Sequence, residues 1–167
     1  MHLKGGLSFC ALVVLVACGA NSETRSIPEE CPQGEFLATF QEYVPNSTFI
    51  ETDWEPVPST DLEAVLNANG LACSYGPQEA EVGATVLWAN GADLFDARSE
   101  QWAADGHQQV EIVGTDEAWA LIEETEVERH LWSVNMLVDG VWIGINATFL
   151  SDLVEARALI DAAIREA

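Results

Sequence analysis

The sequence predicts an α+β fold, with one antiparallel sheet of about five strands and helices packed on one face. The clearest observation is a pair of alternating segments, residues 129–138 and 141–149, separated by Asp139-Gly140. Asp-Gly between two alternating strands is a strong signal for a two-residue hairpin turn. The second observation is that helical segments, recognised by capping sequences and apolar patterns of period 3.6, lie between the shorter strand-like segments.

The first half of the chain supplies elements of both kinds. Residues 36–40 alternate and indicate a short strand. Thr60-Asp61-Leu62-Glu63 has the form of a capping box, so a helix is expected from there to Asn69, ended by Gly70. Strands are then expected over 71–75 and 82–89, and a helix over 90–106.

The second half continues with a strand at 110–112 and a helix opened by Thr115-Asp116-Glu117 that runs through Ile122. After the hairpin, Ser151 is expected to cap a terminal helix that covers the sheet. The helices at Thr60 and Thr115 are each followed by two strands and a helix. A duplicated αββα unit and a chance likeness in an Ala- and Val-rich chain both remain open.

The hairpin has two faces of different character. One face carries apolar residues and is expected to be core: His130, Trp132, Val134, Met136, Val138, Val141, Ile143, Ile145, Ala147 and Phe149. The other face includes Leu131 and mixes Trp142 with the neutral polar side chains of Asn135, Asn146 and Ser133. An aromatic ring among neutral hydrogen-bonding groups suits a ligand or partner surface, and it also suits a sheet face covered by the 45–58 loop that carries Trp54.

The N-terminus predicts export. Lys4 precedes an apolar run from Leu7 to Ala17, which is too short for a membrane span. Leu15-Val16-Ala17-Cys18 resembles the lipobox of bacterial lipoproteins, in which the chain is cut before a cysteine that becomes lipidated. A simple secretory signal is the alternative. We therefore expect a lipoprotein signal peptide at 1–17, a flexible tether at 18–30 and a globular domain at 31–167.

The charge is strongly negative, with 28 acidic and 6 basic residues and a net charge of −22. Such a chain is repelled by phosphate backbones and has no basic patch to overcome that repulsion, so nucleic acid is not an expected partner. With Cys10 and Cys18 assigned to the signal and the lipid, Cys31 and Cys73 are left as one pair in an exported chain. A disulfide is favoured there, while two free thiols or two metal ligands are the alternatives.

Catalytic and metal-binding motifs are missing from the sequence. It contains no Gly-x-Ser-x-Gly, no His-Glu-x-x-His and no phosphate-binding glycine loop, and His107 and His130 are expected to be a loop residue and a core-edge residue. Neither acidic cluster, Glu51/Asp53/Glu55 nor Glu123–Glu128, has the spacing of a calcium loop. No cofactor and no metal ligand is therefore predicted.

The lipobox, the acidic tether, Cys31-Pro32 and the segment Gly70–Gly76 together resemble small exported lipoproteins of high-GC Gram-positive (actinobacterial) type. The resemblance implies a Cys31–Cys73 disulfide and a lipid anchor on the outer side of the cell membrane. The function we expect is non-enzymatic: a binding or cell-envelope accessory module whose partner is an envelope protein or a small ligand. A divalent-cation-binding lipoprotein and an enzyme of unknown class are the alternatives.

Overall fold

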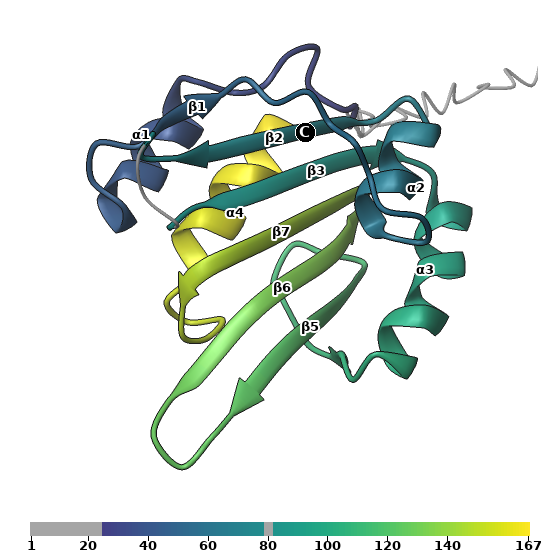
Figure 1. Ribbon diagram of the computed structural model, residues 1–167. Coiled ribbons are helices and arrows are strands. Elements are labelled where there is room, and N and C mark those ends of the chain that lie inside the picture. The colour runs from purple at the N-terminus through teal and green to yellow at the C-terminus, as the bar shows by residue number, and fades with distance from the viewer. Residues whose placement is uncertain (1–24, 79–81) are drawn as a thin grey trace, which may run out of the picture.

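A seven-stranded antiparallel sheet organises the part of the chain that the computed structural model describes, residues 25–78 and 82–167 (Figure 1). The strands are β1 (Thr48–Ile50), β2 (Leu71–Gly76), β3 (Ala84–Asn90), β4 (Gln108–Gln109), β5 (Glu117–Glu124), β6 (Arg129–Val138) and β7 (Val141–Leu150). Their order across the sheet is β1-β2-β3-β7-β6-β5-β4. The helices of this part are α1 (Glu35–Tyr43), α2 (Asp61–Asn67), α3 (Ala92–Ala104) and α4 (Arg157–Glu166).

The β6–β7 hairpin forms the middle of the sheet, because β7 pairs with β3 on one side and with β6 on the other. Val138 lies opposite Val141, and the turn residues Asp139 and Gly140 have φ values of 50° and 83°. Two successive positive φ values are what a two-residue hairpin turn requires. The predicted hairpin is therefore confirmed in its register.

The sheet is larger than the about five strands predicted, and its helices cover both faces rather than one. On one face, Phe36 and Phe40 of α1 and Leu159 and Ile160 of α4 complete the main core. On the other face, α2 and α3 bury a second apolar cluster that contains Val65, Ala72, Leu87, Ala89, Phe95, Trp102 and Trp142. Helices are needed on both faces because β2, β3 and β7 carry apolar side chains on both faces where they lie beneath α2 and α3.

Two predicted elements have the wrong type, and two have the wrong position: the strand expected over 110–112 lies at Gln108–Gln109, and the terminal helix begins at Arg157 rather than after Ser151. Residues 36–40 belong to helix α1, since Phe36 and Phe40, four residues apart, also share one helix face. Residues 117–124 form strand β5, in which Ala118 and Ala120 face the main core.

The second αββα unit consequently lacks its first helix, and the duplication is wrong. Asp116 does not cap a helix; its carboxylate Oδ2 accepts the Asp139 backbone N–H at 2.8 Å, beside the β6–β7 turn. The Thr60 cap is confirmed, because Thr60 Oγ1 accepts the N–H of Glu63 at the start of α2.

The segment before α1 is fastened to the body of the domain. Cys31 and Cys73 form the predicted disulfide, which ties this segment to β2. Arg25 donates to the Asp139 carboxylate and to the Ile164 carbonyl oxygen, and the Ser26 N–H donates to the Ala167 carbonyl oxygen. Arg25 and Ser26 are therefore held against the body of the domain. Residues 1–24, which include the predicted signal peptide and Cys18, lie outside the described residues.

Removing the disulfide should lower stability substantially. The bridge spans a sequence separation of 42 residues. The chain-entropy model gives a contribution of about 4 kcal/mol for a loop of this length. Replacing both Cys31 and Cys73 by Ser should therefore lower the free energy of unfolding by about 2–4 kcal/mol in urea denaturation. An unchanged midpoint would mean that the bridge does not restrict the unfolded chain.

Candidate functional site

A β-bulge in β6 changes which side chains face each side of the sheet. On β7, Leu131 pairs with Leu150 and Ser133 with Asn146. On β5, Leu131 pairs with Ile122 and Ser133 with Leu121, so Trp132 is an extra residue on β6. A bulge of this kind re-aims a side chain and is common beside functional sites.

The bulge places Leu131 in the main core with Val134, whereas Trp132 and Ser133 line a groove on the opposite face. The prediction that Trp132 is a core residue and that Leu131 faces outward is therefore wrong. Strict alternation holds from Ser133 to Val138 and fails at the extra residue. The side chain of Trp132 is 39% exposed.

A row of directly opposed residues runs across six strands next to this bulge. Ile50 of β1 pairs with Ser74 of β2, and the pairing continues through β3, β7, β6 and β5 to Leu121. We name its four central members the polar row: Ser74, Thr85, Asn146 and Ser133. Neighbouring strands lie about 4.8 Å apart, so four residues span roughly 14 Å.

The polar row stands at the edge of the surface that α2 and α3 cover. Two residues along from Ser74 and Thr85, on the same face, are Ala72 and Leu87, which are buried in the second apolar cluster. Figure 1 shows α2 and α3 gathered toward one end of the sheet, with the β5–β6 hairpin projecting at the other end. The uncovered half of this face forms a groove of about 590 Å³.

The groove has unused hydrogen-bonding capacity. In the part of the chain that the structure describes, the side chains of Ser74, Thr85 and Asn146 make no hydrogen bond to another protein group, and all three line the groove. Ser133 is only 8% exposed, and its hydroxyl lies 2.8 Å from His107 Nε2. Hydroxyls and carboxamides both donate and accept hydrogen bonds, so the row can pair with donors or with acceptors on a ligand.

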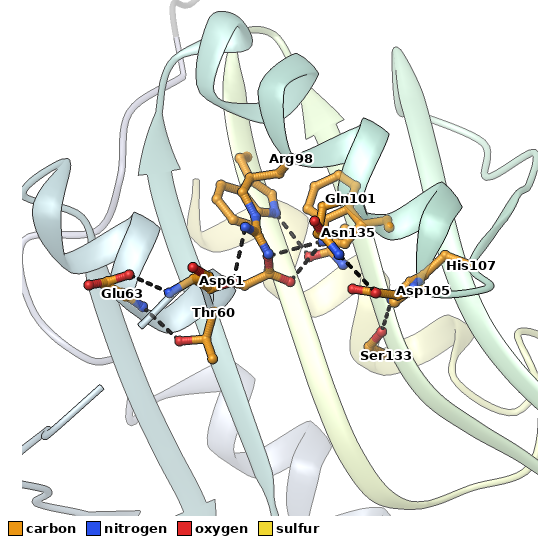
Figure 2. A network of polar contacts seen from close by, with 12 residues as sticks. Thr60, Asp61, Glu63, Arg98, Gln101, Asp105, His107, Ser133 and Asn135 are labelled. Atoms are coloured by element: carbon orange, nitrogen blue, oxygen red, sulfur yellow. Dashed lines mark hydrogen bonds and ion pairs between the residues drawn. The ribbon is translucent and has the colours of Figure 1, made fainter. Parts of the chain in front are cut away.

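The Asp61 carboxylate closes the covered end of the groove and joins α2 to α3 (Figure 2). It accepts Arg98 Nε at 2.7 Å and Trp102 Nε1 at 2.9 Å, and Arg98 Nη2 lies 2.7 Å from it. The side chains of Asp61 and Arg98 are 18% and 16% exposed. Three donors converge on one poorly solvated carboxylate, so its charge is compensated before any ligand arrives.

His107 lines the groove together with Asp61 and Ser133. Burial lowers the pKa of this imidazole below its usual value of 6.5, and the Asp61 and Asp105 carboxylates oppose that shift. The ring is therefore neutral at pH 7. Among the described residues its buried Nδ1 has no hydrogen-bond partner.

The predicted binding residues divide into two pairs. Asn146 and Ser133 belong to the polar row. Trp142 is fully buried, packs against Trp102 with ring centroids 5.3 Å apart, and donates its indole N–H to Asn135 Oδ1 at 3.0 Å. Neither Trp142 nor Asn135 can contact a ligand, because both are buried. Phe95 and Trp102 of α3 pack on Trp142, and Trp54 of the 45–58 loop packs on the same apolar cluster. Trp54, from that loop, donates to the Ala72 carbonyl oxygen at 3.1 Å.

Four residues that line the groove are not among the binding residues predicted from the sequence: Ser74, Thr85, Trp132 and His107. The signal for Ser74 and Thr85 was present, because each is a polar residue on an otherwise apolar strand face. The register that sets them opposite Asn146 was not visible in the sequence. The bulge at Trp132 has no local sequence signature.

The acidic side chains do not form a metal centre in the part of the chain that the structure describes, since no group of three or more His, Cys, Asp or Glu residues there could hold an ion. No helix within the same ranges is long and apolar enough to cross a membrane. No family model matches the chain, and neither a curated protein nor a solved structure is significantly similar to it.

The buried state of His107 should make stability depend on pH. Because the folded-state pKa lies below the 6.5 of the unfolded chain, the unfolded chain takes up the proton first as the pH falls. The wild-type protein should therefore lose stability from about pH 6.5 downward, relative to a His107→Gln variant. Urea denaturation of both proteins between pH 7.5 and pH 5 measures the difference. Parallel curves would contradict the assigned environment of His107.

Proposed function

We propose that this chain is a lipid-anchored, extracytoplasmic binding protein that holds a small ligand in the groove over the polar row. The observation that carries the proposal is the row itself. Three of its side chains have no protein hydrogen-bond partner among the described residues, although they line a cavity of about 590 Å³. Ligand sites in proteins have volumes of about 300–1,000 Å³ and combine apolar walls with a few convergent polar groups.

The groove walls fit that composition. Ile50, Val82 and Leu121 supply apolar surface around the row, and Trp132 adds an aromatic ring. The strands that carry the row lie in the middle of the sheet, where each is paired on both sides. Groups on such strands are held more firmly than groups on loops, so the site is preorganised.

The contact between Ser133 and His107 has the distance of a nucleophile–base pair but lacks the third group of a triad. In a triad, a carboxylate on the other imidazole nitrogen fixes the tautomer in which the base accepts the serine proton. Here the nearby Asp61 carboxylate is engaged by Arg98 and Trp102, and Nδ1 of His107 has no hydrogen-bond partner in the described part of the chain. This favours binding over hydrolysis as the role of the pair.

The attachment of Arg25 fits a lipid anchor at Cys18. Six residues separate Cys18 from Arg25, so the two are at most about 25 Å apart when the chain is extended. Arg25 is held beside the β6–β7 turn through Asp139. The polar row crosses β7 at Asn146, five residues from the start of that strand and thus about 17 Å farther along.

Filling the groove should abolish ligand binding without unfolding the domain. Thr85→Trp places a large ring in the middle of the polar row, and aromatic residues are well tolerated in strands. In a thermal-shift screen of a small-molecule library, the wild-type protein should be stabilised by at least one compound that has no effect on Thr85→Trp. Val113→Trp, which adds the same ring at an exposed position outside the groove, is the control and should respond as the wild type does.

Compounds that stabilise Thr85→Trp and the wild-type protein equally would place the binding site elsewhere. A library that stabilises neither protein would count against a small-ligand function altogether.

The anchor is tested separately. Cys18→Ser should move the protein from the membrane fraction to the soluble fraction when the chain is expressed in a bacterium that processes lipoproteins. A single acyl chain gives marginal anchoring, and bacterial lipoproteins carry several, so the change in partition should be nearly complete. Membrane attachment of Cys18→Ser in the same fractionation would contradict a lipid at this residue.

A further inference from the structure

We propose that the groove binds an uncharged, polyhydroxylated ligand, a sugar unit of a neutral glycan, which stacks on Trp132 and hydrogen-bonds to the polar row. This inference rests on the proposed binding function and names its ligand class. It follows from three properties of the groove: the absence of available charge in its described lining, the kind of polar group in the row, and the setting of the indole.

Charge is the first property. Asp61 is the one acidic side chain among the described residues that line the groove, and Arg98 already compensates it. No lysine or arginine belongs to that lining, so a phosphate or carboxylate ligand would find no cation. The net charge of −22 repels anions further. A ligand with a formal negative charge is therefore disfavoured.

The polar groups of the row are the second property. Three members carry hydroxyls and the fourth, Asn146, carries a carboxamide, and each of these groups can donate and accept hydrogen bonds. A sugar hydroxyl has the same dual character, so a line of such groups can exchange hydrogen bonds with consecutive hydroxyls. A ligand without hydroxyl or amide groups would leave the row desolvated and without partners, at a cost in affinity.

The setting of Trp132 is the third property. Its indole Nε1 donates to Glu123 Oε2 at 2.9 Å, and its ring lies against His130 with centroids 4.2 Å apart. The indole is thus fixed, its only donor is satisfied, and what it offers to the groove is apolar ring surface. The C–H face of a sugar ring packs on such a surface while its hydroxyls point elsewhere.

The groove is open over Ser74, Thr85 and Asn146, which are partly exposed, whereas Ser133 lies beside His107 and is 8% exposed. A groove that is open to solvent and crosses several strands suits one sugar unit within a longer glycan. An isolated small molecule is usually enclosed by its binding site. The partner is therefore a glycan segment and not an isolated monosaccharide.

The test uses the full chain in a detergent without a glycoside headgroup. The probes are an array of neutral glycans that includes β-linked and α-linked glucose and N-acetylglucosamine oligomers, with glucuronic acid and choline as charged probes. Saturation-transfer NMR measures binding. We expect a neutral oligomer to bind, Trp132→Ala to weaken its binding at least 10-fold, and Trp132→Phe to retain most of it.

A second variant guards against misfolding of Trp132→Ala. Thr85→Val removes one hydroxyl of the row at constant shape and should also weaken binding about 10-fold. Val127→Ala, at an exposed position outside the groove on the same β5–β6 hairpin, should bind as the wild type does.

Binding of choline or glucuronic acid with no signal from any neutral glycan would overturn the sugar assignment while leaving the groove a ligand site. Silence from every probe, together with a negative small-molecule screen, would overturn the proposed function as well. Neutral-glycan binding that both Trp132→Ala and Thr85→Val leave unchanged would also refute the inference.

Discussion

The Asp61 carboxylate is the contact on which the arrangement of this face depends. It lies at the first residue of α2 and receives hydrogen bonds from Arg98 and Trp102 of α3, so one group fixes two helices relative to each other. Hydrogen bonds to a charged acceptor contribute about 1.5–3 kcal/mol each. Without this carboxylate, the poorly exposed Arg98 guanidinium would lose its ion-pair partner, a substantial penalty at a site so poorly solvated.

The consequence of this tie is that α2 and α3 cover one half of the sheet face and leave the other half open. Beneath the helices the face is apolar, with Ala72, Leu87 and Trp142 fully or nearly buried. Beyond them the same strands carry the polar row. The covered apolar half therefore gives the domain stability. The open polar half presents Ser74, Thr85 and Asn146, whose side chains have no hydrogen-bond partner among the described residues.

Much of the local structure could be predicted from the sequence. The Asp139-Gly140 hairpin, the Thr60 cap and the Cys31–Cys73 disulfide each follow from local chemistry or from cysteine arithmetic, and the structure contains all three. The two elements of wrong type arose from ambiguous periodicity. Phe36 and Phe40 fit both a strand face and a helix face. Residues 117–124 carry apolar side chains on both faces, and such a segment cannot be told from a helix by periodicity alone.

The candidate site could be predicted in part. Ser133 and Asn146 can be identified from the sequence because the hairpin register is set by a recognisable turn. Their neighbours Ser74 and Thr85 come from strands whose pairing depends on contacts distant in sequence. Trp132 was assigned to the core because a bulge, set by the tertiary pairing of β6 with both neighbours, reverses the alternation at one residue.

The central claim is that one strand face is covered at one end and open at the other. Thr85 and Ala89 lie on the same face of β3, four residues apart, and only Ala89 belongs to the buried cluster. The test uses variants in which Cys10 and Cys18 are replaced by Ser. In the folded Thr85→Cys variant, the thiol at position 85 should react rapidly with a maleimide. Ala89→Cys should react only after unfolding. Equal reactivity of the two cysteines, or protection of Cys at position 85, would contradict the account.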